Sequence, residues 1–260
     1  MKNWKSAAAK QLLRSTGSSS VPLAARAVAG SLLRDQYSPP TDLDAIADRL
    51  EASIAEADIF GSGELRNKKD GYEIVYAKDL ALPRRRFTIA HELAHIAIIR
   101  LGSRSATTGK EVERLCDLIA VELLMPWSVF ESHTPLNPRL GDIFALATKF
   151  QTSLNATAQR CAEVRPITVL EVANRKTTWC FGVLRRSSAL QDEGLRRHML
   201  HACDGHSGSA ALYVNDNSSL LPIRLEYQSL GRTGRALCLL TSASPAEAQA
   251  ALAQDSDIPF

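Results

Sequence analysis

Two histidines and a glutamate interrupt an apolar stretch of the chain in the order His91, Glu92, Leu93, Ala94, His95. On a helix, residues four positions apart lie on the same face one turn apart, so both imidazoles can point at a single ion. Glu92 projects about 100° around the axis from His91, which places a carboxylate beside that ion without requiring it to bind. The spacing therefore predicts a zinc site in which an unligated carboxylate activates water for peptide hydrolysis.

This chemistry requires residues 84–100 to form a helix. The stretch is apolar nearly all round, which is typical of a helix buried in a core. Burying two imidazoles and a carboxylate costs free energy unless each has a partner, and one cation supplies a partner for all three. The alternative interpretation is a pair of core histidines that bond to backbone carbonyls. The apolar setting favours the metal.

A second helix is predicted over residues 110–126, where the third ligand can be sought. A catalytic zinc usually has three protein ligands and one open position for water. Glu113 and Asp117 lie on one face of this helix, whereas Glu122 faces the opposite way. We expect Glu113 to bind the metal and Asp117 to accept the free ring N–H of a ligating histidine. Glu122 remains the alternative ligand, and Cys116 is interpreted as a packed thiol.

Two longer motifs resemble those of a known family. The sequences RRRFTIAHELAH (84–95) and ERLCDLIAVELLMP (113–126) together resemble the ImmA/IrrE family of zinc metallo-endopeptidases, which are gluzincin-like and carry the H-E-x-x-H pattern. The resemblance covers roughly residues 22–165. Ala94 and Cys116 stand where the family usually has Gly and Ala, and neither departure removes a chemical group that the reaction needs.

The resemblance implies a role for each residue of the site. The zinc ligands would be His91, His95 and Glu113, the general base would be Glu92, and Asp117 would support the ligands. The implied substrate is a small helix-turn-helix transcriptional repressor, whose cleavage releases a stress-response or mobile-element programme. The alternative function is a catalytically idle protein of the same fold that binds and sequesters a transcriptional regulator. Glu92 favours the enzyme, because an idle protein has no need of a general base.

Composition indicates an ordinary soluble globular protein. The chain has 260 residues, 45% hydrophobic and 23% charged, with a net charge of +3, and has room for one or two domains. This charge is too mild to indicate a nucleic-acid partner, and no apolar run approaches about 18 residues. The five cysteines form no Cys-x-x-Cys pair and are odd in number, which argues against a disulfide framework. We expect reduced thiols and a cytoplasmic location.

The expected fold class is α+β, with a zincin-like metallopeptidase domain, a helical segment of helix-turn-helix type and a smaller α+β C-terminal domain. Strands divided by turns, and a helix near 189–202, are predicted after Pro166. The STGSSSV stretch is expected to be a flexible linker. The expected divisions are 1–21 as an N-terminal tail or helix, 22–140 as the metallopeptidase domain, 141–165 as the helical segment and 166–260 as a regulatory or substrate-recognition domain.

The two helices predicted between residues 141 and 164 have the outline of a DNA-reading motif. The second of them carries one base, Arg160, and has Glu163 near its end. A recognition helix needs several donors for base edges and phosphates. We therefore expect a packing or substrate-docking role for this segment. Direct DNA binding is disfavoured and stands as a third hypothesis.

Three other groups are given ordinary structural roles. Tyr72 and Tyr76 are interpreted as strand residues rather than as oxyanion ligands, and residues 84–86, three arginines, as a solvated lead-in to the motif helix. The last group is interpreted as surface residues because its spacing matches no closed metal site; it comprises His198, His201, Cys203, Asp204 and His206.

Overall fold

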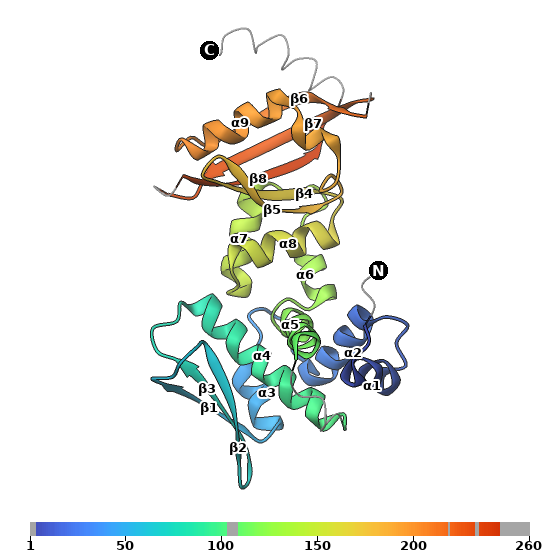
Figure 1. The fold of residues 1–260 in the computed structure, drawn as a ribbon, viewed down its shortest axis with the longest axis vertical. Coiled ribbons are helices and arrows are strands. Elements are labelled where there is room, and N and C mark those ends of the chain that lie inside the picture. The colour runs from blue at the N-terminus through green and yellow to red at the C-terminus, as the bar shows by residue number, and fades with distance from the viewer. Residues whose placement is uncertain (1–3, 103–108, 218, 232–233, 245–260) are drawn as a thin grey trace. The chain divides into compact units, whose positions relative to one another are not determined.

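The structure is a computed structural model that describes residues 4–102, 109–217, 219–231 and 234–244 (Figure 1). The chain divides into two compact units, one of Met1–His133 with Ala147–Ser153 and the other of Thr134–Leu146 with Leu154–Phe260. This division differs from the expected boundaries. The segment 4–21 belongs to the first unit because its helix packs on the next one, and the expected helical segment 141–165 is shared between the units.

The first unit combines helices with a small three-stranded sheet. In the sheet, β3 lies between β1, to which it is parallel, and β2, to which it is antiparallel. β2 is therefore an edge strand. The helices are α1 (Ala7–Thr16), α2 (Val21–Leu33), α3 (Leu43–Arg49), α4 (Leu82–Arg100), α5 (Lys110–Leu124) and α6 (Trp127–His133), and the strands are β1 (Ala52–Ala57), β2 (Gly63–Lys68) and β3 (Gly71–Ala77).

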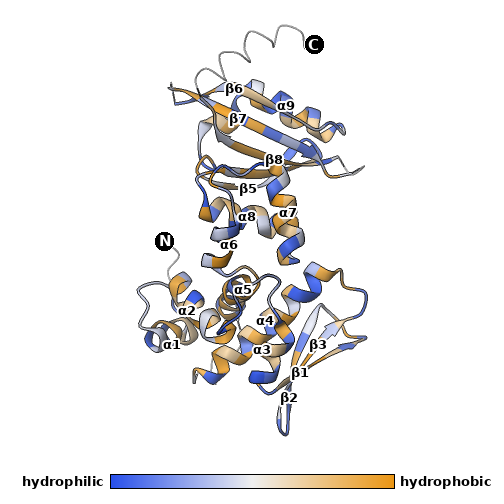
Figure 2. Ribbon diagram, turned by 180° about the vertical axis from the view of Figure 1, so that it is seen from behind, coloured by the Kyte–Doolittle hydropathy of each residue, from blue (hydrophilic) through white to orange (hydrophobic). Residues whose placement is uncertain are grey.

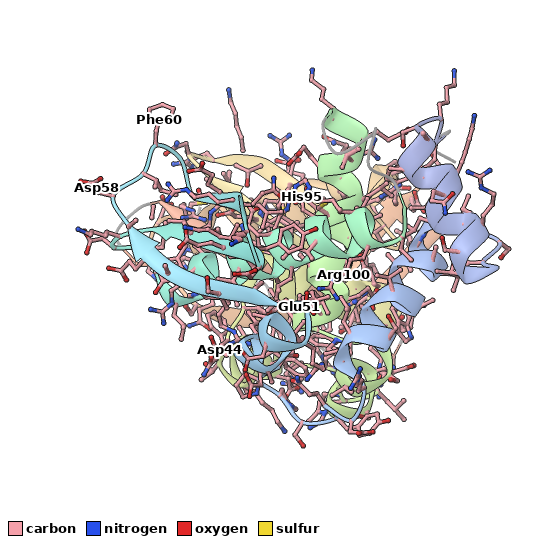
Figure 3. All side chains as sticks on the ribbon, turned by 90° about the horizontal axis from the view of Figure 1, so that it is seen from below. Asp44, Glu51, Asp58, Phe60, His95 and Arg100 are labelled. Atoms are coloured by element: carbon pink, nitrogen blue, oxygen red, sulfur yellow. The ribbon has the colours of Figure 1, made fainter. Side chains whose placement is uncertain are left out.

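Helix α4 carries the H-E-x-x-H motif and is buried, as its sequence predicts. Leu93, Ala94 and Ile96 have no exposed surface, and Figure 2 shows hydrophobic residues along most of the helix. At its C-terminal end, the Arg100 guanidinium donates to the Leu50 carbonyl at 2.8 Å and to Glu51 at 3.3 Å (Figure 3). These bonds tie the end of the helix to the start of β1, so the motif sits on a rigid element.

Helix α5 packs against α4 and has the apolar face that its sequence predicts. Leu115, Ile119 and Leu123 recur every four residues and have no exposed surface. The helix ends at Leu124, two residues before Pro126, whose ring cannot continue a helix. The α4 and α5 pair is the scaffold of the site described below.

The expectation of a flexible linker at STGSSSV is wrong. Helix α1 runs through Thr16 and ends at Gly17, whose φ of 64° lies in the left-handed region that glycine adopts without strain. Helix α2 begins at Val21, with a proline among its first two residues. The stretch is a short turn between two packed helices, because Ala8, Ala9 and other α1 side chains are buried.

The second unit is built on a five-stranded antiparallel sheet with the order β5-β4-β8-β7-β6. The predicted strands and the predicted helix are confirmed. Helix α9 packs on the sheet, and Leu195 and Ala202 of α9 join Leu170 and Leu225 of the strands in its core. The elements are α8 (Leu154–Val164), β4 (Thr168–Ala173), β5 (Lys176–Gly182), a 3-10 turn (Ser188–Gln191), α9 (Glu193–Cys203), β6 (Gly208–Asp216), β7 (Ser219–Ser229) and β8 (Arg235–Ser242).

Helix α7 (Leu140–Phe150) is the predicted first helix of the 141–165 segment, and the division between the two units passes through it. Gln151 turns the chain after α7 with a φ of 53°, and α8 follows and packs on β4 and β5. The mixed α+β class expected from the sequence is confirmed. No helix within the described ranges is long and apolar enough to cross a membrane.

Candidate metal centre

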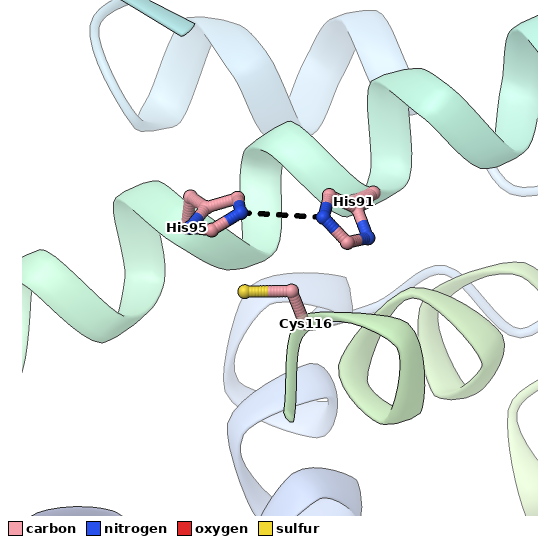
Figure 4. Close-up of side chains that lie close together, drawn as sticks. All are labelled: His91, His95 and Cys116. Atoms are coloured by element: carbon pink, nitrogen blue, oxygen red, sulfur yellow. Dashed lines mark hydrogen bonds between the residues drawn. The ribbon is translucent and has the colours of Figure 1, made fainter. Parts of the chain in front are cut away.

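The two histidines of the motif face each other on α4 (Figure 4). His91 Nε2 and His95 Nε2 lie 3.2 Å apart, and the side chains are 15% and 14% exposed. Such an approach follows from the spacing of four residues, which stacks the side chains one turn apart. Both rings therefore present a nitrogen to the same point in a largely buried setting.

Helix α5 brings two carboxylates to these rings. Glu113 lies with one oxygen 3.1 Å from His91 Nε2 and the other 3.6 Å from His95 Nε2. Asp117 lies one turn further on, with its Oδ1 3.0 Å from His91 Nδ1. The structure thus brings together the four residues that the sequence places at the metal, and it gives the two ring nitrogens of His91 different partners.

The donor groups of His91, His95 and Glu113 lie near the spacing that a tetrahedral zinc needs. Metal to ligand distances of about 2.0–2.2 Å put neighbouring ligand atoms about 3.3–3.6 Å apart. The two histidine nitrogens here are 3.2 Å apart, and the two oxygens of Glu113 lie 3.1 Å from His91 Nε2 and 3.6 Å from His95 Nε2, which is close to that spacing. A neutral His91 that donates from Nδ1 to Asp117 presents a lone pair at Nε2, towards His95 Nε2 and the Glu113 carboxylate. A small divalent cation such as zinc satisfies all three donors at once, so these residues fit the metal.

The ionisation of the histidines is set by burial and by these carboxylates. Burial favours neutral His91, but the hydrogen bond and negative charge of Asp117 outweigh it and raise the pKa of His91. Burial and the neighbouring His91 lower the pKa of His95. His95 is therefore held in the neutral form, which is the form that binds metals.

Glu92 lies against β2. A Cβ atom at Gly63 would stand 2.2 Å from Thr88 Cγ2 and 3.3 Å from Glu92 Oε1, so only glycine allows the strand to approach this closely. Burial raises the pKa of Glu92, the charge of Glu113 adds to the increase, and His91 opposes it. A raised pKa brings a carboxylate nearer to the range in which it can accept and return a proton at neutral pH. The sequence gives no signal for the approach of Gly63.

Cys116 lies nearer to the histidines than its interpretation as a packed thiol implies. It has no exposed surface, and its Sγ and one nitrogen of each of His91 and His95 all lie within 4.8 Å of one another (Figure 4). Burial raises the pKa of the thiol. The helical spacing of three residues from Glu113 is the signal that could have placed Cys116 on the same face.

Glu122, the alternative third ligand, has a different partner. Its carboxylate lies 3.2 Å from Arg26 Nε, and the Arg26 guanidinium stacks on Trp127 at 3.6 Å from the ring centre. These residues line a pocket of about 380 Å³ beside α2 and α6. Glu113 is the acid of α5 that faces the histidines, and Glu122 is the acid that anchors α2.

The three arginines before the motif are less solvated than expected. Arg84 donates to Ser62 Oγ at 2.9 Å, and Arg85 lies 5.8 Å from the centre of the Tyr76 ring. Arg86 is half-buried and donates to the Thr41 carbonyl at 2.6 Å, and burial lowers its pKa. The expectation of a solvated lead-in is wrong for Arg86, because its guanidinium joins α4 to the segment before α3.

The residues interpreted as structural lie in ordinary settings. Tyr72 and Tyr76 are half-buried on β3, the middle strand of the small sheet. In the second unit, the exposed rings of His201 and His206 stack in parallel with centres 3.8 Å apart, and Cys203 and Asp204 lie at the end of α9. Ring stacking accounts for the histidine pair without a metal.

Comparison with known proteins identifies the part of the chain that carries this geometry. The M78 peptidase family model, described as the IrrE N-terminal-like domain, matches residues 45–162. The matched stretch contains α4, α5 and every residue of the candidate centre. This part of the chain is an IrrE N-terminal-like domain. The resemblance to the ImmA/IrrE family that the sequence motifs carry is confirmed.

Two further comparisons concern the solved structures and the curated proteins. A transcriptional regulator from Mycobacterium tuberculosis has a similar solved structure, with a TM-score of 0.53 and 14% sequence identity over 96% of this chain and 84% of that one. At this identity the likeness shows a shared fold. The search of curated proteins gave no match.

Asp117→Ala is expected to weaken zinc binding by about 10- to 100-fold, because the residue that accepts the Nδ1 proton of a metal-binding histidine typically contributes this much. Competition against a chromophoric chelator measures the change. Glu64→Ala is the matched control, since Glu64 is an exposed carboxylate of the same domain that pairs with Arg66 at 3.0 Å. Equal affinities for the two variants would show that Asp117 does not support the ligand.

Proposed function

We propose that the protein is a zinc-dependent endopeptidase whose metal ligands are His91, His95 and Glu113. The convergence of two histidine nitrogens and the Glu113 carboxylate, at 3.1–3.6 Å from one another and beside Glu92, is the observation that carries the proposal. Structural zinc sites are closed by four protein ligands, whereas catalytic sites keep a position for water. Three ligands and a separate carboxylate fit the catalytic kind.

Each side chain has a distinct part in the proposed reaction. A bound zinc ion would lower the pKa of its water and polarise the scissile carbonyl. Glu92 takes up a proton from the attacking water and returns it to the departing amine, a task suited to a carboxylate whose pKa burial raises. Asp117 holds the Nδ1 proton of His91, which keeps Nε2 free for the metal. Glu113 would supply negative charge that partly neutralises a bound ion.

The proposed substrate is a small helix-turn-helix transcriptional repressor, cut to release a stress-response or mobile-element programme. The IrrE N-terminal-like domain supports this proposal through the family resemblance. A cytoplasmic location is part of it, and the free cysteines Cys116, Cys161, Cys180, Cys203 and Cys238 agree with a reducing compartment.

The test is to incubate the zinc-loaded protein with a small repressor encoded beside its gene and to follow both by intact-mass spectrometry. We expect cleavage at one or a few bonds, loss of cleavage when a chelator removes the metal, and recovery when zinc is restored. Tight binding of the repressor by the zinc-loaded protein without any cleavage would replace the proposal with sequestration, the alternative function.

The full-length protein is expected to show no sequence-specific binding to duplex DNA at physiological salt. Arg160 is 2% exposed and its guanidinium lies 3.0 Å from Glu163, while α8 packs on β4 and β5. The one base of this helix is thus held away from any phosphate. Fluorescence anisotropy with labelled duplexes from the gene's own neighbourhood measures binding. Specific binding below about 10⁻⁶ M that resists moderate salt would contradict the expectation.

A further inference from the structure

Cys116 and Glu113 approach the histidine pair from one face of α5 but in different settings. Glu113 is half exposed, with 52% of its side-chain surface accessible, whereas Cys116 has none. The Sγ atom and a nitrogen of each histidine lie within 4.8 Å of one another. The two histidines therefore have both a half-exposed carboxylate and a buried sulfur close to their rings.

This sulfur is positioned for coordination after a small adjustment. In a tetrahedral zinc site with a Zn–S distance of about 2.3 Å and Zn–N distances of about 2.0–2.1 Å, sulfur and nitrogen lie about 3.5 Å apart. The side chain of Cys116 rotates about one bond, and in Figure 4 its Sγ lies on the side of His95 that faces α5. Thiolate and imidazole are both ligands that suit zinc.

We propose that Cys116 is a fourth protein ligand of the metal, bound from the buried side together with His91, His95 and Glu113. The inference rests on the proposed zinc site and adds a ligand to it. Binding breaks the S–H bond and forms a metal–sulfur bond, and the proton passes to solvent. Four protein donors would leave no position for water in a tetrahedral site, so the proposed hydrolysis would require that Glu113, the half-exposed ligand, give its place to water.

The direct test is the absorption spectrum of the full-length protein loaded with Co²⁺ in place of zinc. A cobalt–thiolate bond gives a charge-transfer band in the near ultraviolet, which nitrogen and oxygen ligands do not produce. We expect this band in the wild type and its loss in Cys116→Ala and Cys116→Ser. Cys161→Ala is the matched control, because Cys161 is equally buried but belongs to the second unit; it should keep the band.

Two further measurements, proton release and zinc affinity, test the inference without the cobalt spectrum. Zinc binding should release about one proton more per ion from the wild type than from Cys116→Ala, since a coordinating thiol must lose its proton. The zinc affinity of Cys116→Ala should fall at least about 10-fold, because even a residue outside the coordination sphere can contribute this much. Circular dichroism of each variant verifies the fold, and the family's usual alanine at this position favours a folded Cys116→Ala.

The outcomes separate the inference from the proposed function. Suppose that Co²⁺ binds the wild type and that His95→Ala abolishes this binding. If the wild type then shows no thiolate band, or if Cys116→Ala keeps the band, the inference is overturned and the three-ligand site stands. If the wild type binds neither Co²⁺ nor Zn²⁺, the proposed metallopeptidase fails together with the inference. A band that disappears only in the two Cys116 variants and in the histidine variants supports the fourth ligand.

Discussion

Glu92→Gln is expected to abolish measurable peptide cleavage while leaving the zinc content and the fold unchanged. The amide is nearly the same size as the carboxylate, and the donor atoms of His91, His95 and Glu113 are untouched. It cannot accept the proton that the carboxylate takes from water. General-base catalysis typically contributes about 10²- to 10⁴-fold, so the turnover rate should fall by at least about 100-fold.

The measurement combines three readouts on wild type and variant: zinc by elemental analysis, cleavage of the repressor by mass spectrometry and repressor binding. Glu64→Gln is the matched control, because Glu64 lies near enough for its charge to act on Glu92 but is half exposed on β2. It should keep most of the activity. Cleavage by Glu92→Gln within about tenfold of the wild type would remove Glu92 from the role of general base.

His95→Ala is expected to eliminate stoichiometric zinc binding, and cleavage with it. The substitution removes one of the two imidazoles whose Nε2 atoms lie 3.2 Å apart, and a catalytic site depends on few protein ligands. Wild type should hold about one zinc per chain. His91→Ala should behave in the same way, and Glu113→Gln should weaken zinc binding as well.

Glu122→Gln is the matched control for the carboxylate, because Glu122 lies on the same helix but faces Arg26. It should keep the full zinc content. It is expected to lower the free energy of unfolding instead, since it removes the negative partner of a guanidinium that stacks on Trp127. Dialysis followed by elemental analysis measures the zinc, and urea denaturation measures the stability. Zinc lost from Glu122→Gln and kept in Glu113→Gln would move the third ligand to Glu122.

The sequence by itself determined the features that depend on local periodicity. The spacing of His91 and His95 fixes both rings on one face of any helix they occupy, and apolar residues on all sides predict that this helix is buried. Alternating apolar residues and turn clusters predict the strands and the helix of the second unit, and the structure has them there. These features need only the geometry of the chain over a few residues.

The tertiary structure decided which faces meet. Helical spacing places Glu113 and Glu122 on opposite sides of α5, but only the packing of α5 between α4 and α2 shows that Glu113 reaches the histidines while Glu122 reaches Arg26. The same packing brings Cys116 within reach of both rings. The helical repeat in the sequence fixes the direction of a side chain around its own helix. Which residue that side chain contacts depends on the element that packs beside the helix.

Contacts between elements distant in sequence had no local signal at all. Gly63 on β2 lies against Glu92, and the half-buried Arg86 donates to the Thr41 carbonyl. Neither residue lies in a sequence motif that predicts which residue it contacts. The sequence therefore determined which groups of this protein can do chemistry, and the packing of α4, α5 and β2 decided which of them share a site, because that packing alone sets the distances between them.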